Sequence, residues 1–171
     1  SYKQALKIKP DYAEAYSNMG NALQDKGDLE AAIDSYKQAL SIKPNFAEAY
    51  YNMGNALNDK GDLEAAIDSY KNAIKIKPDF AEAYNNMGNA LRDQGDLEAA
   101  IDSYKQALSI KPDYAEAHNN MGNMLEELGR LEGAETSYTQ AIALEPDLES
   151  AAQNMVKLPV GQLDLKILAL L

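Results

Sequence analysis

The sequence has no cysteine and only one histidine, His118, among its 171 residues. The absence of cysteine excludes thiol catalysis, disulfides and thiolate metal sites. A single histidine without a cysteine nearby argues against a zinc site, and we expect His118 to be a packed structural residue. The glycines stand singly, eight of the ten at the repeat spacing, so no glycine-rich loop for phosphate is present. The sequence therefore predicts no metal and no cofactor.

Basic residues are also in short supply, since 16 lysines and arginines stand against 27 aspartates and glutamates, giving a formal net charge of −11 at pH 7. This charge repels nucleic acid and anionic membranes, so the expected partner is a neutral or basic protein or peptide. No apolar run approaches the roughly 20 residues needed to span a bilayer. We predict no nucleic-acid and no membrane partner, with the cytoplasm as the default location.

The dominant pattern is a repeat of 34 residues, marked by Pro10, Pro44, Pro78, Pro112 and Pro146. A repeat of this length predicts one supersecondary unit stacked on copies of itself. The predicted parts are residues 1–12 (second helix of a truncated repeat), 13–46, 47–80 and 81–114 (repeats), 115–148 (a divergent repeat), 149–158 (a capping helix) and 159–171 (an apolar tail). Nearly all carboxylates recur once per repeat at cap or solvent-facing positions, whereas catalysis needs convergent titratable groups, so we expect no enzyme activity.

Each repeat is predicted to form two helices. In the first, Tyr16, Met19, Gly20 and Leu23 fall three or four residues apart and share one face. We expect this helix to end at Gly27, because glycine readily adopts the left-handed conformation that follows the last turn of a helix. The next residue, an aspartate in the first three repeats, is predicted to cap the second helix, which ends before the lysine–proline pair.

Two further rows have a predicted structural role. The aspartate or asparagine after each proline is expected to cap the first helix, with a glutamate three residues later as its partner. These pairs are Asp11/Glu14, Asn45/Glu48, Asp79/Glu82 and Asp113/Glu116. A glycine inside a helix costs about 1 kcal/mol, so we expect it to permit a close approach to an alanine of the second helix. These pairs are Gly20/Ala32, Gly54/Ala66, Gly88/Ala100 and Gly122/Ala134.

These residues carry a family resemblance. Tyr16-x-x-Met19-Gly20-x-x-Leu23, followed by Ala32-x-x-x-Tyr36, Ala39 and Pro44, resembles the tetratricopeptide repeat signature. The resemblance covers residues 1–158. It implies an all-α fold, a right-handed superhelical solenoid of antiparallel helix pairs whose first helices line a concave groove. It also implies that peptides or extended protein segments bind in this groove.

Two ladders of asparagine follow the groove that the resemblance implies. The first is Asn18, Asn52, Asn86 and Asn120, and the second is Asn21, Asn55, Asn89 and Asn123. Asparagine is a mediocre helix former, so these fixed positions need a reason. Amides donate and accept hydrogen bonds, which suits them to hold the backbone of a peptide. The alternative is that they hydrogen-bond between neighbouring helix pairs, and one residue can do both.

Two rows beside the ladders vary between repeats and are candidates for selectivity. One row is Ser17, Tyr51, Asn85 and Asn119, and the other is Gln24, Asn58, Arg92 and Glu126. Tyr51 is the best candidate for an anchor because it is an aromatic residue on an otherwise polar row. Free drift at a surface position is the alternative. The predicted peptide-binding residues are the two ladders together with Gln24, Tyr51, Asn58, Asn85, Arg92 and Asn119.

Two groups of tetratricopeptide proteins offer a comparison. Some hold the C-terminal carboxylate of heat-shock chaperones with cations in the groove, but here the corresponding rows carry residues such as Glu48 and Tyr51. Binding of a chaperone tail is therefore not expected. The asparagine ladders are more similar to the repeat arm of O-GlcNAc transferases, which cradles the backbone of a substrate. No catalytic domain accompanies them in this sequence.

The sequence thus predicts a non-enzymatic scaffold that binds an extended segment of a partner protein. Two alternatives stay open. The array could be a substrate-recognition or spacer arm excised from a larger enzyme, such as a glycosyl- or sulfotransferase, as its start within a repeat suggests. It could also self-assemble into a homo-oligomer through Leu163 to Leu171, the most apolar stretch, although folding back over the end of the array is the simpler role for that stretch.

Overall fold

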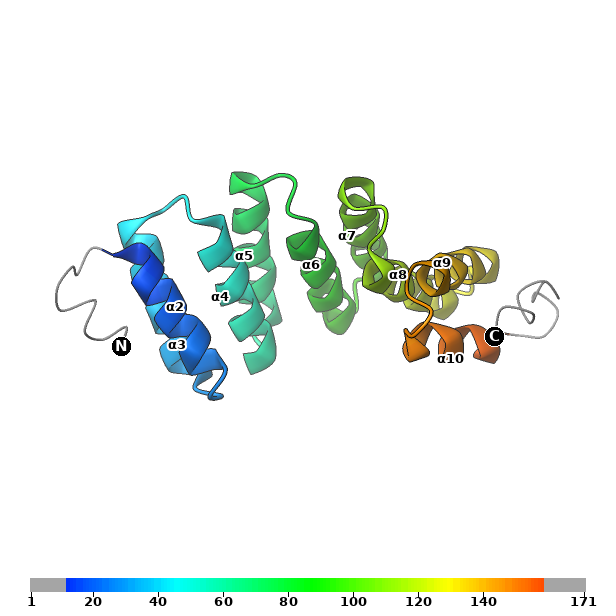
Figure 1. Ribbon diagram of the computed structural model, residues 1–171, viewed down its shortest axis with the longest axis horizontal. Coiled ribbons are helices and arrows are strands. Elements are labelled where there is room, and N and C mark those ends of the chain that lie inside the picture. The colour runs from blue at the N-terminus through cyan, green and yellow to red at the C-terminus, as the bar shows by residue number, and fades with distance from the viewer. Residues whose placement is uncertain (1–11, 159–171) are drawn as a thin grey trace. The chain divides into compact units, whose positions relative to one another are not determined.

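The computed structural model describes residues 12–158, and every regular element in this part of the chain is an α-helix (Figure 1). The helices are α2 (Ala13–Gln24), α3 (Leu29–Ile42), α4 (Ala47–Lys60), α5 (Leu63–Ile76), α6 (Ala81–Gln94), α7 (Leu97–Ile110), α8 (Ala115–Glu127), α9 (Leu131–Leu144) and α10 (Glu149–Lys157). The predicted all-α fold of stacked helix pairs is confirmed. The helix predicted within residues 1–12 and the tail 159–171 lie outside the described residues.

The chain divides into two compact units between Ala90 and Leu91, within α6. In the first unit α2 packs on α3, α3 on α4, and α4 on α5. In the second unit α7 packs on α8, α8 on α9, and α9 on α10. No helix within residues 12–158 combines the length and the apolar character needed to cross a membrane.

The turn inside each pair follows the prediction. Gly27, Gly61, Gly95 and Gly129 have φ angles of 78°, 85°, 91° and 71°, a left-handed conformation that residues with a side chain rarely adopt. Directly after this glycine, Asp28, Asp62 and Asp96 accept a hydrogen bond from the backbone N–H of Ala31, Ala65 and Ala99. These aspartates are the predicted N-caps of α3, α5 and α7.

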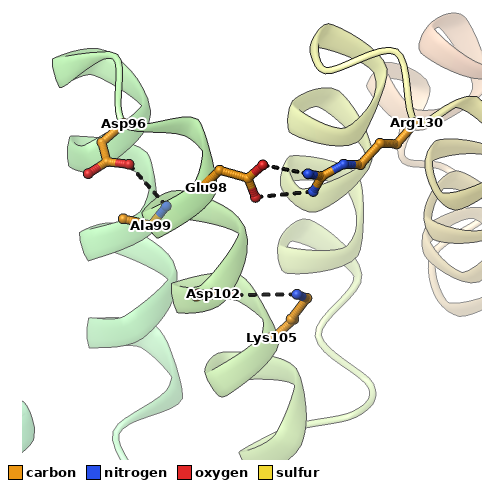
Figure 2. Close-up of polar contacts among 6 residues, drawn as sticks. All are labelled: Asp96, Glu98, Ala99, Asp102, Lys105 and Arg130. Carbon is orange, nitrogen blue, oxygen red and sulfur yellow. Dashed lines mark hydrogen bonds and ion pairs between the residues drawn. The ribbon is translucent and has the colours of Figure 1, made fainter.

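The fourth repeat has Arg130 at the capping position, and no side chain caps α9. The Arg130 guanidinium instead donates to both carboxylate oxygens of Glu98, near the start of α7 (Figure 2). Figure 2 also shows Asp96 capping α7 and the neighbouring pair of Asp102 and Lys105. The lost cap is thus accompanied by an ion pair between successive repeats. The side chains of Arg130 and Glu98 are 50% and 61% exposed.

The predicted caps of α4 and α8 are wrong. These helices follow Phe46 and Tyr114, one residue later than expected, and no side chain caps them. The predicted cap Asp11 lies outside the described residues. The lysine–proline–aspartate run forms a turn of its own, in which the backbone N–H of Phe80 donates to the Lys77 carbonyl at 3.2 Å. Proline favours the second position of such a turn, so the aspartate takes the third and the aromatic residue closes it.

The glycine inside the first helix does permit a close approach, but the predicted partner is wrong. A Cβ built on Gly54 would lie 2.6 Å from Cε1 of Tyr70, and a Cβ on Gly20 would lie 2.5 Å from Cε1 of Tyr36. The tyrosine lies one helical turn after the expected alanine and on the same face. Its ring, rather than the alanine methyl, therefore fills the space that glycine leaves.

The core of each unit is built from small residues around these tyrosines. Tyr36, Tyr70, Tyr104 and Tyr138 are buried, together with the alanines four residues before and three residues after each of them. At the end of the described chain, α10 buries Met155 and Leu158 against Ala134 and Tyr138. A short helix thus covers the apolar face of the last pair.

Candidate functional site

The asparagines of the first helices form hydrogen bonds from one repeat to the next. Asn52 Nδ2 donates to Asn21 Oδ1 at 3.1 Å, and Asn86 Nδ2 donates to Asn55 Oδ1 at 2.9 Å. Each bond therefore joins the first ladder of one repeat to the second ladder of the repeat before it. We call the eight side chains of the two ladders the asparagine face.

The buried tyrosines donate to the same oxygens. The hydroxyl of Tyr36 donates to Asn21 Oδ1 at 2.8 Å, and the hydroxyl of Tyr70 donates to Asn55 Oδ1 at 2.9 Å. One amide oxygen thus accepts a bond from the second helix of its own repeat and a bond from the first helix of the next. The alternative role of the ladders, hydrogen bonding between neighbouring helix pairs, is therefore present in the molecule.

The second unit repeats this arrangement and adds a member that the sequence prediction missed. Asn123 Oδ1 accepts from the hydroxyl of Tyr138 at 2.9 Å and from Asn154 Nδ2 at 2.8 Å. Asn154 stands 34 residues after Asn120 and continues the first ladder into α10. The repeat spacing alone could have found it.

Burial keeps the tyrosine hydroxyls protonated. It raises the pKa of Tyr36 to about 12, and the negative charge of Asp25 adds to the effect. Burial likewise raises the pKa of Tyr70, Tyr104 and Tyr138 well above the ordinary value. For Tyr138, the hydrogen bond to Glu126 raises the pKa further. Tyr36, Tyr70 and Tyr138, which donate to the asparagine face, therefore stay protonated well above neutral pH.

Tyr51 is not a free anchor. Its ring centroid lies 4.8 Å from that of Phe80 and 6.1 Å from that of Tyr70, and its hydroxyl accepts a bond from Asn86 Nδ2 at 3.1 Å. The aromatic side chain on this row packs in the core between two repeats. Tyr51 is half-buried, so its role as an anchor for a ligand stays a prediction. A single helix does not show which part of its surface the next repeat contacts.

The other three residues of that row are buried. Ser17, Asn85 and Asn119 are 4%, 0% and 7% exposed. Asn85 and Asn119 were predicted to contact a ligand, but side chains this deeply buried do not line an accessible surface. The row lies on the packed side of the first helix, next to the asparagine face.

The second variable row sits beside the tyrosine hydroxyls. Gln24 Oε1 accepts from Tyr36 at 3.1 Å, and Glu126 Oε2 accepts from Tyr138 at 2.7 Å. Arg92 instead pairs with the adjacent carboxylate of Asp93 at 2.7 Å. Asn58 is different again, because its Oδ1 is buried and has no hydrogen-bond partner.

An open hollow of about 170 Å³ lies beside Asn58. Its walls are polar and are formed by Asn55, Asn58, Asp59, Tyr70, Asn86 and Asn89. The hollow therefore brings together four of the predicted ligand-binding asparagines. Asp59 and Tyr70 were not among the predicted site residues, because the sequence assigned them to a turn and to packing.

The other predicted residues differ in their exposure. Asn18 and Asn21 are exposed, Asn52, Asn89 and Asn123 are half-buried, and Asn120 is buried. Most side chains of the asparagine face are therefore accessible, and Asn120 is the exception.

Comparison with known proteins identifies the family. A family model described as TPR repeat matches residues 1–27, 20–59, 54–92 and 88–129, and a model described as tetratricopeptide repeat matches residues 115–148. The chain belongs to the tetratricopeptide repeat family. No curated protein matches it.

Solved structures support the same assignment for these tetratricopeptide repeats. A crystal structure of MamA is 31% identical, with a TM-score of 0.79 over 89% of this chain and 87% of that chain. A structure of MamA 41-end from Desulfovibrio magneticus RS-1, at 24% identity and a TM-score of 0.78, covers 86% of this chain and 84% of its own, and shows the shared fold. The repeats and the MamA-like neighbours support a protein-interaction scaffold. The similarity of the ladders to O-GlcNAc transferases stays a prediction.

His118, the one histidine, occupies the tyrosine position of the fourth tetratricopeptide repeat. The ring is half-buried, and its Nε2 lies 3.0 Å from the Pro112 carbonyl oxygen. Within residues 12–158, no group of three or more histidine, cysteine, aspartate or glutamate residues is arranged to hold a metal ion.

Proposed function

We propose that the asparagine face binds an extended, neutral or basic segment of a partner protein. The observation that carries the proposal is that Asn21 and Asn55 use only the oxygen of the side-chain amide to bond the protein. Each uses Oδ1 to accept two hydrogen bonds from the protein. Each Nδ2 group makes no hydrogen bond to the described residues, and neither is buried.

This arrangement suits recognition of a peptide backbone. The two bonds to Oδ1 fix the orientation of the amide, so the N–H groups on the other side point to solvent without a further loss of side-chain freedom on binding. Backbone carbonyls of an extended segment are acceptors that recur along the chain. Donors that recur with the repeat can therefore hold such a segment with little regard to its side chains.

The net charge of −11 sets the preference for the partner. It repels acidic segments and attracts basic ones at long range, with an effect on association that weakens as salt rises. The proposal therefore excludes strongly acidic partners. The alternatives of an excised enzyme arm and of a self-assembling array stay predictions, and the tail of the latter lies outside the described residues.

A peptide selected from a random library against the intact chain tests the proposal. Addition of an electrically neutral selected peptide is expected to shift the NMR signals of the Asn21 and Asn55 side-chain amides. The amides of Gln38 and Gln106, which are exposed on second helices, provide the control in the same spectrum. A peptide that binds and shifts only the control amides, or a failure to select any binder, would contradict the proposal.

A further inference from the structure

The residues that line the hollow beside Asn58 differ from their counterparts one repeat earlier in the length of one side chain. Its lining residues in the second and third repeats are Asn55, Asn58, Asp59, Tyr70, Asn86 and Asn89. The residues 34 positions earlier are Asn21, Gln24, Asp25, Tyr36, Asn52 and Asn55. The two sets are identical in residue type except that Gln24 is replaced by Asn58.

The loss of one methylene changes what the amide reaches. Gln24 Oε1 accepts a bond from the Tyr36 hydroxyl, and Gln24 Nε2 donates to Asp59 Oδ2 at 2.8 Å. The shorter side chain of Asn58 does not reach Tyr70, whose hydroxyl donates to Asn55 alone. Asn58 Oδ1 is left buried and without a partner, and Asn58 is one of the residues that line the hollow. A buried polar atom without a partner destabilises the fold, so a donor that reaches Asn58 Oδ1 supplies the hydrogen bond that the protein itself does not make.

The other groups of the wall favour a positively charged donor. Asp59 contributes a carboxylate, of which only Oδ2 is engaged, by Gln24. The Tyr70 oxygen retains lone pairs after its proton is donated. None of the six lining residues is cationic. Three oxygen acceptors, one of them charged, therefore border the space.

We infer that this hollow is a subsite for a basic side chain, lysine or arginine, of the bound segment. The ammonium or guanidinium group donates to Asn58 Oδ1 and to the Asp59 carboxylate, and both head groups carry enough N–H donors for the two bonds. The inference rests on the proposed function, because the subsite would receive a side chain of the segment that the asparagine face holds. It adds a preference at one position of that segment.

A small probe tests the subsite without any peptide. N-acetyl-lysine N-methylamide and N-acetyl-arginine N-methylamide are titrated separately into the isotope-labelled chain, with N-acetyl-norleucine N-methylamide as the uncharged control. We expect the Asn58 side-chain amide to shift saturably with a cationic probe, with weaker binding at higher salt. Saturation with lysine alone, with arginine alone or with both supports the subsite and names its side chain. A shift of equal size with norleucine, or no shift with either cation, overturns it.

Two variants make the test specific. Asn58→Gln is expected to reach Tyr70 as Gln24 reaches Tyr36, fill the hollow and abolish the response. Gln24→Asn is expected to open a second hollow and give a second saturable response at residue 24. If Asn58→Gln leaves the response intact, or if Gln24→Asn creates none while the chain stays folded, the inference is wrong. Binding of a neutral peptide without a response to the cations would reject the subsite alone, and the reverse result would reject the peptide site alone.

Discussion

At the scale of the residue, one amide oxygen holds two repeats together. Asn55 Oδ1 accepts from Tyr70 in its own repeat and from Asn86 in the next. The tyrosine is buried, so its hydroxyl depends on this acceptor. The Nδ2 group of the same side chain makes no hydrogen bond to the described residues. In the proposed function, structure and recognition are divided between the two ends of one amide.

Substitution of Asn55 by alanine should therefore destabilise the protein. The change leaves the Tyr70 hydroxyl and Asn86 Nδ2 without their shared acceptor, which we expect to lower the free energy of unfolding by about 1–3 kcal/mol. Asn18→Ala is the control, because Asn18 is exposed and a surface substitution changes stability by about 0.5 kcal/mol or less. Urea unfolding followed by circular dichroism measures both. Equal effects of the two substitutions would show that the hydrogen bonds contribute nothing.

The buried phenols predict a loss of stability in alkali. Below the ordinary tyrosine pKa of about 10, both the folded and the unfolded chain hold the phenolic protons. Above it the unfolded chain loses protons first, because burial raises the pKa of Tyr36 to about 12 and those of Tyr70, Tyr104 and Tyr138 as well. The folded state then binds more protons, so the stability is complete below about pH 10 and falls as the pH rises further.

Thermal melting between about pH 9 and about pH 12 checks this expectation. The melting temperature should fall across the range, and the fall should be shallower in Tyr36→Phe, which removes one of the titrating groups. A parent protein whose melting temperature stays level across this range would contradict the assignment of raised tyrosine pKa values.

At the scale of the element, the turns and helix ends follow from local chemistry, which is why the sequence predicted most of them. The left-handed glycines, the aspartate caps of α3, α5 and α7, and the stop before proline each depend on one or two adjacent residues. The starts of the first helices were mispredicted, because two local rules compete at Lys77-Pro78-Asp79 and the proline turn prevails over the aspartate cap.

Packing between the two helices of a pair makes its own prediction. Alanine at Gly54 would place its Cβ 2.6 Å from the Tyr70 ring, which cannot move far because Tyr70 is buried. We expect Gly54→Ala to lower the free energy of unfolding by about 1–2 kcal/mol, even though alanine gains about 1 kcal/mol in helix propensity.

Gly133→Ala provides the matched control. Its Cβ would lie 3.2 Å from Cδ1 of Leu125, the end of a flexible and half-buried side chain. We expect this substitution to stabilise α9 by up to about 1 kcal/mol through helix propensity. Urea unfolding of both variants measures the two changes in the free energy of unfolding. A stabilised Gly54→Ala protein would show that the tyrosine ring does not limit the approach of the two helices.

At the scale of the whole molecule, hydrogen bonds between neighbouring repeats recur within each of the two compact units. The spacing of 34 residues located the asparagine rows in the sequence, but it did not show that Asn21 and Asn55 use only one end of their amides. Whether an atom is already bonded depends on the neighbouring repeat. For the same reason the sequence could not show that Asn85 is buried, that Tyr51 packs against Phe80, or that a hollow lies beside Asn58.

The central claim is that Nδ2 donors on the asparagine face bind a peptide backbone while Oδ1 holds the repeats together. The double variant Asn21→Asp with Asn55→Asp separates the two tasks, because aspartate keeps an oxygen for the tyrosine and the next asparagine but removes the donor. Gln38→Glu with Gln106→Glu adds the same charge on exposed second-helix positions and serves as the control.

Calorimetric titration of one neutral selected peptide into the parent chain and both double variants is the most direct measurement. The account predicts an affinity about tenfold lower for the aspartate variant, since two neutral hydrogen bonds are each worth about 0.5–1.5 kcal/mol, with unchanged affinity for the glutamate control. An aspartate variant that remains folded and binds the peptide as tightly as the parent chain would contradict the account.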